Sequence, residues 1–227
     1  MNNQLFKNTD FPLIVSIPEN TLEYAIAAAK NGADAVKLHT NVKHRVTGKL
    51  HETWDEVKPA AKAISEKIDI PIGIVPGSET MATEKEINEM FDVGLSFFDV
   101  YIEYAPLYLL KNKMHRMLAL NYTFDLSFTP YIKNLKPDSL EISIINSDSY
   151  GESLTADDLL KYSKIVEDID CPAFVPTEKN ILPEEIQFLR SIGVSGIIIG
   201  PIVTGTDMDQ FSHRVNEYKK AIKKLWR

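Results

Sequence analysis

Side chains capable of acid–base chemistry interrupt several short apolar segments of this sequence. Lys37 and His39 lie two positions apart in one such segment. Glu103 ends a second segment, and Glu141 lies inside a third. Alternate residues of a β-strand point to the same face, so Lys37 and His39 share one face of their strand. Because burial of unpartnered polar groups costs free energy, we expect these side chains to converge on one another.

An ammonium group beside carboxylates can move a proton next to a carbonyl group. Lys37 could act as a Schiff-base amine if burial lowers its pKa, or as a cation that stabilises an enolate. We predict Glu141 as the base and either Glu103 or His39 as its partner. Asp99 lies nearer the amino end of its segment, and we expect a structural role for it.

Two other interpretations of the same residues remain open. His39, Glu103 and Glu141 together form an oxygen-rich ligand set with one imidazole, which suits a divalent cation. Buried lysine–carboxylate pairs can also serve only to satisfy one another. The first alternative predicts a metal-assisted hydrolase or lyase. A barrel that binds a metabolite without turnover is a separate hypothesis.

The elements that must position these residues alternate regularly along the chain. Short apolar segments predict strands at Leu13–Pro18, Asp34–Thr40, Pro71–Gly77, Phe97–Glu103, His115–Tyr122, Ser139–Ile144, Cys171–Pro176 and Ser195–Gly200. Amphipathic segments predict helices at Asn20–Asn31, Thr53–Lys67, Thr83–Val93, Pro106–Lys111, Ser127–Leu135, Ala156–Asp168, Pro183–Ile192 and Asp209–Trp226. Asn20, Thr155 and Pro183 fit helix starts, and Gly32, Gly94 and Gly193 fit helix ends.

Eight strand–helix units predict an α/β protein in which a parallel sheet closes into a single (β/α)8 barrel. The strands read as nearly continuous apolar runs, as expected for parallel strands that are covered on both faces. No linker or shift in composition divides the chain, so we expect one domain over residues 1–227. Barrel active sites are built at the carboxyl ends of the strands, where Lys37 and Glu141 would lie.

Composition excludes several classes of protein. The chain has 227 residues, 44% of them hydrophobic, and a formal net charge of −7, which argues against a nucleic-acid partner. Its one cysteine, Cys171, excludes an internal disulfide and a multi-cysteine metal site. No apolar run is long enough to span a membrane, so we expect a cytoplasmic protein without a membrane partner.

Two long polar connections follow the second and sixth predicted strands, Thr40–Glu52 and Asn146–Thr155. The first carries five side chains that can be cationic: Lys43, His44, Arg45, Lys49 and His51. We predict that Lys43 and Arg45 form a positive rim that captures an anionic substrate, since a cleft lined by one sign of charge concentrates the opposite sign.

The last quarter of the chain resembles the phosphate-binding (β/α)8, or TIM, barrels. The segment Val175-Pro-Thr-Glu-Lys-Asn and the later Gly193-Val-Ser-Gly-Ile-Ile-Ile-Gly-Pro-Ile carry this resemblance. The superfamily includes ribulose-phosphate epimerases, N-acetylmannosamine-6-phosphate epimerases, and the histidine and tryptophan biosynthetic barrels. In these barrels, backbone amides after strands seven and eight hold a phosphate.

By position, the resemblance assigns phosphate binding to Gly200, Pro201 and Ile202, although Pro201 has no amide hydrogen. The family has a Gly-Gly pair after strand seven, where this chain has Thr177-Glu178-Lys179. Lys179 could supply a point charge in place of backbone donors, whereas Glu178 would repel a phosphate. Thr177 and, from the fifth strand, Asn121 complete the predicted substrate-binding residues.

Together these observations predict an enzyme that acts on a small anionic, phosphorylated sugar or polyol. The reaction would begin with proton transfer next to a carbonyl, as in an isomerase, an epimerase or an aldolase-type lyase. No organic cofactor is expected, and a divalent metal enters only in the hydrolase or lyase alternative. Phosphate-binding barrels often dimerise, so the resemblance implies a homodimer.

Overall fold

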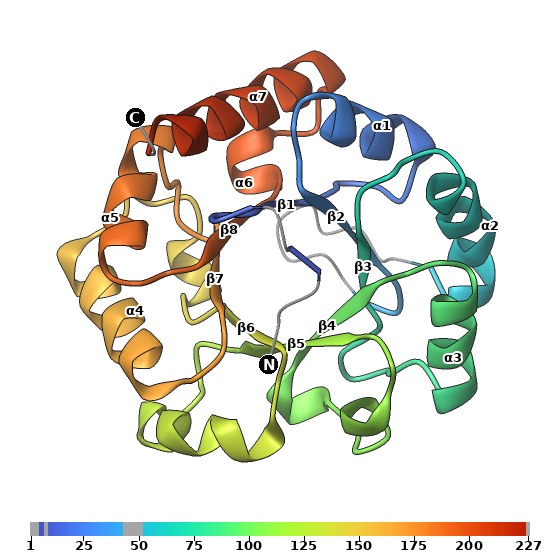
Figure 1. Cartoon of the computed structure of the whole chain (residues 1–227), viewed down its shortest axis with the longest axis horizontal. Helices are drawn as coiled ribbons and strands as arrows, with labels where there is room; N and C mark the ends of the chain where they lie inside the picture. Colours follow the sequence, from blue (N-terminus) through green and yellow to red (C-terminus); the bar gives the residue numbers. More distant parts are fainter. Residues whose placement is uncertain (1–4, 7–8, 43–51, 226–227) are drawn as a thin grey trace.

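The protein is a closed barrel of eight parallel strands, in the order β1 to β8, with helices on the outside (Figure 1). The computed structural model describes residues 5–6, 9–42 and 52–225. Each strand pairs with the next in sequence, and β8 closes on β1. The prediction of a (β/α)8 barrel is confirmed.

The strands lie within the predicted segments. They are β1 (Leu13–Ser16), β2 (Ala35–His39), β3 (Ile72–Val75), β4 (Phe97–Tyr101), β5 (His115–Leu120), β6 (Ser139–Ile142), β7 (Ala173–Pro176) and β8 (Gly196–Ile199). The α-helices are α1 (Leu22–Lys30), α2 (Trp54–Ser65), α3 (Glu84–Asp92), α4 (Ala156–Asp168), α5 (Ile186–Ser191), α6 (Pro201–Thr204) and α7 (Met208–Lys224). The 3-10 helices are η1 (Ile102–Tyr104), η2 (Leu109–Lys111), η3 (Leu126–Leu135), η4 (Ser147–Ser149) and η5 (Pro183–Glu185).

Most of the predicted helix boundaries have the expected local chemistry. Thr155 caps α4, and Asp158 completes a capping box with it. Pro183 takes the first position of η5. Gly32, Gly94 and Gly193 follow α1, α3 and α5 and have positive φ angles, where a side chain would be strained. Asn20 is the exception: Thr21 caps α1 instead, and the Asn20 side chain bonds to β2.

Two predicted helices between β4 and β6 take another form. The segment 106–111 contains only the short η2, and 126–135 is a 3-10 helix with Pro130 inside. Proline has no amide hydrogen for the α-helical bonding pattern. Strand β4 also ends at Tyr101, two residues before the predicted end, because the chain turns there into η1.

An apolar floor fills the amino-terminal half of the barrel. Its buried side chains come from six strands and from the segment before β1: Phe6, Ile14, Ala35, Phe97, Met117, Phe174 and Ile198. Gly73 makes room for the Phe97 ring, since a Cβ atom there would come within 2.1 Å of it. Lys37, Asp99 and Glu141 lie above this floor, toward the carboxyl ends of the strands.

The exterior helices cover the strands with a second apolar layer, in which Trp54, Tyr162, Phe211 and Tyr218 are fully buried. Within residues 5–6, 9–42 and 52–225, no helix has the length and apolar character needed to cross a membrane.

Candidate active site

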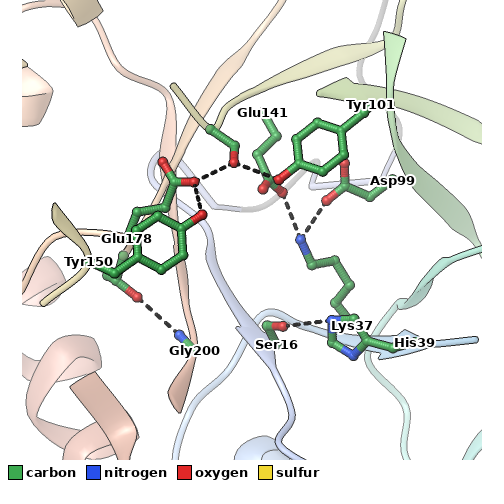
Figure 2. A network of polar contacts seen from close by, with 11 residues as sticks. Ser16, Lys37, His39, Asp99, Tyr101, Glu141, Tyr150, Glu178 and Gly200 are labelled. Atoms are coloured by element: carbon green, nitrogen blue, oxygen red, sulfur yellow. Dashed lines mark hydrogen bonds and ion pairs between the residues drawn. The ribbon is translucent and has the colours of Figure 1, made fainter. Parts of the chain in front are cut away.

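Lys37 lies at the centre of the barrel between two carboxyl groups (Figure 2). Its Nζ atom is 2.5 Å from Asp99 Oδ2 and 2.7 Å from Glu141 Oε2. The three residues are the third residues of β2, β4 and β6, and they are 5%, 2% and 7% exposed. Alternate strands of a (β/α)8 barrel contribute side chains to one layer, which explains why these three meet.

The two carboxyl groups keep Lys37 charged. Burial alone lowers the pKa of its ammonium, but the charges of Asp99 and Glu141 and their hydrogen bonds outweigh burial and raise it above the usual range. Burial and the neighbouring Glu141 raise the pKa of Asp99 well above its usual value. The site therefore pairs a stable cation with a carboxyl group that retains its proton more strongly than an exposed aspartate does.

Lys37, Asp99 and Glu141 line a cavity of about 560 Å³ near the carboxyl ends of the strands. Ammonium groups have three N–H donors, and the described partners of Lys37 use two of them. Among the described residues, Asp99 Oδ1 is buried without a hydrogen-bond partner. A donor and an acceptor are thus available to a small molecule in this cavity.

His39 lies at the carboxyl end of β2, beside Ser16. Its Nε2 atom is 3.1 Å from Ser16 Oγ, and both residues line the cavity (Figure 2). The side chain of Asn20 fixes the backbone here, since its Nδ2 donates to the His39 carbonyl (2.6 Å) and its Oδ1 accepts from the His39 amide (3.0 Å). The end of β2 is therefore held at a defined position.

A second polar cluster surrounds Glu178, just after β7. Glu178 Oε1 accepts from Ser143 Oγ and from Tyr150 Oη, both at 2.6 Å, and Oε2 accepts from the Ile145 amide at 3.0 Å. Tyr101 Oη is 3.0 Å from Ser143 Oγ (Figure 2). Burial raises the pKa of Glu178 to about 7, although its three hydrogen bonds act in the opposite direction.

The ends of β7 and β8 are joined by hydrogen bonds. The Gly200 amide donates to Thr177 Oγ1 at 3.1 Å, and the amides of Thr177 and Glu178 donate to backbone carbonyls at 2.9 Å. Lys179 Nζ donates to Glu152 Oε2 at 2.9 Å. The amides of Thr177, Glu178 and Gly200 therefore already have acceptors within the protein.

The structure brings together most of the residues that the sequence assigned to the site. The cavity is lined by Lys37, His39, Glu141, Thr177, Gly200, Pro201 and Ile202. Lys43 and Arg45 lie outside the described residues.

Three of the assigned residues lie away from the cavity. Glu103 is exposed in η1 and accepts a hydrogen bond from Asn121. Asn121 is the second of the three residues, and its Oδ1 atom accepts a hydrogen bond from Thr123. Lys179 is buried against Glu152. The turn that ends β4 at Tyr101 is what removes Glu103 from the interior.

The metal-binding alternative depended on His39, Glu103 and Glu141. In the described part of the chain, no group of three or more His, Cys, Asp or Glu side chains is arranged to hold a metal ion. Glu103 lies outside the cavity that His39 and Glu141 line, so these three residues do not form a ligand set.

The sequence prediction gave three residues of the site no catalytic or binding role. Asp99 was assigned to structure because of its depth, yet it has the same position in β4 as Lys37 has in β2. The layer rule for alternate strands could have found it. Glu178 was considered only as an obstacle to phosphate. Tyr150 comes from the connection between β6 and α4, and no local sequence pattern places its hydroxyl on Glu178.

Comparison with known proteins supports this architecture. None of the protein-family models matches the chain, and no curated protein matches it. Among solved structures, a thiamine phosphate pyrophosphorylase from Pyrococcus furiosus is 14% identical, with a TM-score of 0.66 and coverage of 96% of this chain and 98% of that one. A phosphoribosyl anthranilate isomerase from Thermus thermophilus is 12% identical, with a TM-score of 0.69 and coverage of 95% and 100%.

A third similar structure contains a phosphorylated substrate. The (S)-3-O-geranylgeranylglyceryl phosphate synthase of Thermoplasma acidophilum, in complex with sn-glycerol-1-phosphate, is 16% identical, with a TM-score of 0.63 and coverage of 96% of this chain and 95% of that one. Each of these three structures is named for a phosphorylated compound, and each has the barrel fold of this chain. At these identities the likeness establishes the fold.

Proposed function

We propose that this protein is an enzyme that transfers a proton next to the carbonyl group of a small metabolite, as an isomerase, an epimerase or a carbon–carbon lyase. The observation that carries the proposal is the Lys37 ammonium, held between two buried carboxyl groups at the base of a cavity. The enzymes that share the fold provide associational support only.

The geometry suggests a role for each of the three groups. The third N–H of Lys37 would donate to the substrate carbonyl oxygen and stabilise the negative charge that develops there. Glu141 would remove the proton from the neighbouring carbon, so that the C–H electron pair forms an enolate. Asp99, whose raised pKa favours the protonated form, would return a proton to complete an isomerisation or epimerisation.

The raised pKa of Lys37 favours a cationic role over that of a Schiff-base amine. A Schiff base begins with attack by a neutral amine, and both carboxyl partners of Lys37 stabilise its protonated form. A retro-aldol cleavage remains compatible with this site, since it also passes through an enolate that a cation stabilises.

Proton exchange with solvent tests the proposal directly. The protein is incubated in deuterated water with aldoses and ketoses of three to six carbons, each with and without a terminal phosphate, and deuterium at carbon is measured by NMR. We expect exchange on at least one compound, and Lys37→Met should reduce its rate by about 10² to 10³-fold. Lys179→Met removes a buried lysine outside the cavity and should leave the rate within about threefold.

A second variant keeps this test informative if Lys37→Met destabilises the fold. Glu141→Gln removes the proposed base but leaves Lys37 paired with Asp99, and the loss of a general base should reduce exchange by about 10² to 10⁴-fold. Exchange at the wild-type rate in both variants contradicts the proposal. Absence of exchange across the whole panel favours a barrel that binds without turnover.

A further inference from the structure

The residues that follow β7 and β8, Thr177 and Glu178 on one side and Gly200 and Pro201 on the other, form a corner of the cavity. This corner presents hydrogen-bond acceptors where a phosphate site needs donors. The Gly200 amide is bonded to Thr177 Oγ1, and the amides of Thr177 and Glu178 are bonded to the carbonyls of Ile198 and Pro176. Pro201 has no amide hydrogen to offer. Three amides at this corner are therefore engaged within the protein, and Pro201 supplies none.

The Glu178 carboxylate replaces those donors with negative charge. An ionised carboxylate only accepts hydrogen bonds, so Ser143, Tyr150 and the Ile145 amide must all donate to it. Since the Ser143 hydroxyl donates to Glu178, it accepts from Tyr101. All of these neighbours stabilise an anion at this position.

Glu178 retains capacity for one more donor. A carboxylate has about four acceptor sites, and the described donors occupy two on Oε1 and one on Oε2. The residue also lines the cavity that contains Lys37. A ligand hydroxyl that reaches the corner would therefore meet an acceptor.

The charges of the described side chains that line the cavity also disfavour a phosphate. Four carboxyl side chains line it, Glu79, Asp99, Glu141 and Glu178, against Lys37 and His39. Lys37 is already neutralised by its two carboxyl partners, and Lys179 by Glu152. Neither of these two lysines is therefore left without an anionic partner to balance a phosphate.

We propose that the cavity takes an unphosphorylated, hydroxyl-rich carbonyl compound, with one of its hydroxyls donating to Glu178, and that Glu178 excludes the corresponding phosphate ester. This inference rests on the proposed function, because it supplies the substrate class for the Lys37 site. Although the barrel resembles phosphate-binding enzymes, its strand-seven and strand-eight corner selects against phosphate.

Binding measurements on matched compounds test this inference. Thermal stabilisation and titration calorimetry at pH 8 compare inorganic phosphate, free C3–C6 aldoses and ketoses, and their terminal phosphate esters. For the wild type we expect stabilisation by at least one free sugar, binding of its ester at least tenfold weaker, and no stabilisation by inorganic phosphate. In Glu178→Gln, which removes the charge and little volume, the discrimination should shrink at least tenfold.

A control variant separates the charge of Glu178 from its packing. Tyr101→Phe removes a hydroxyl that bonds to Ser143 and not to Glu178, so it leaves the charge of the carboxylate, and the discrimination should persist. Glu178→Asp provides a second variant if Glu178→Gln fails to fold, because it keeps the negative charge, and it should also retain the preference for the free sugar. Loss of discrimination in Tyr101→Phe or Glu178→Asp would overturn the role of the charge.

The remaining outcomes are also decisive. Tighter wild-type binding of the esters, stabilisation by inorganic phosphate, or no stabilisation by any free sugar overturns the inference. Proton exchange on a phosphate ester that also binds more tightly keeps the proposed function and overturns only the substrate class. Glu178-dependent binding of a free sugar without any proton exchange supports the substrate class and contradicts the proposed function.

Discussion

Two clusters of buried carboxyl groups lie in the same barrel and are stabilised in different ways. Asp99 and Glu141 share the cation of Lys37, whereas Glu178 is held by two hydroxyl groups and one amide. The charges of Asp99 and Glu141 raise the pKa of Lys37 and keep it an ammonium. Burial raises the pKa of Glu178 to about 7, because the neutral donors lower it by less than burial raises it. The ion pairs thus keep Lys37 charged, whereas Glu178, which has only neutral donors, can change its protonation near neutral pH.

The largest expected difference between the clusters follows removal of the cation. Lys37→Met leaves Asp99 and Glu141 buried together without a counter-ion, and it should lower the free energy of unfolding at pH 7 by about 3–5 kcal/mol. Urea unfolding measures this change. Lys179→Met is the control: its partner Glu152 is largely exposed, so the loss should be clearly smaller. Equal losses would contradict the distinction between the clusters.

The pH dependence of stability should isolate Glu178. Its folded pKa of about 7 exceeds the usual glutamate value, so between about pH 4.5 and 7 the native state binds the proton more tightly than the unfolded state. This contribution to stability is complete at low pH and is lost as pH rises through 7, on the order of 3 kcal/mol in total. Glu141 also faces Glu178 and adds to the shift, while Ser143, Tyr150 and the Ile145 amide oppose it.

Urea unfolding between pH 4.5 and 8 measures this effect as the difference between the wild type and Glu178→Gln. Asp99 contributes a slope of the same sign in both proteins, and the subtraction removes it. The variant should lose less stability than the wild type as the pH rises. Parallel pH profiles for the two proteins would show that folding does not raise the pKa of Glu178.

The smallest effects should separate single hydrogen bonds within the Glu178 cluster. Tyr150→Phe removes a donor from a charged acceptor and should cost about 1.5–3 kcal/mol. Tyr101→Phe removes a bond between two neutral hydroxyls and should cost about 1 kcal/mol. Urea unfolding at pH 8, where Glu178 is mostly ionised, makes the comparison. A larger loss of stability for Tyr101→Phe than for Tyr150→Phe would contradict the assignment in which Tyr101 donates to Ser143 and Ser143 donates to Glu178.

The fold could be predicted from the sequence because its signals are local. Apolar strands and amphipathic helices alternate eight times, and closure of eight parallel strands follows from packing. The meeting of Lys37 with Glu141 was also predictable, since both lie on the interior face of their strands. Asp99 required one further rule, that residues at equal depth in alternate strands form one layer.

Other parts of the site depend on contacts that no sequence pattern specifies. Glu103 has the right alternation for the interior, but the turn after Tyr101 places it on the surface beside Asn121. The Tyr150 hydroxyl reaches Glu178 across 28 residues of sequence, through the path of a connecting loop. The bond between Gly200 and Thr177 likewise depends on how two strand ends approach each other. Such contacts are set by tertiary packing rather than by spacing.

The apolar floor has a consequence for the order of events in a reaction. Phe6, Met117, Phe174 and the other floor residues fill the barrel below Lys37, so a molecule bound there has a closed wall behind it. In the proposed reaction, reactant and product then share one mouth, and a new reactant cannot arrive before the product departs. For a cleavage that yields two fragments, the fragment nearer the mouth leaves first, and the one against Lys37 leaves last.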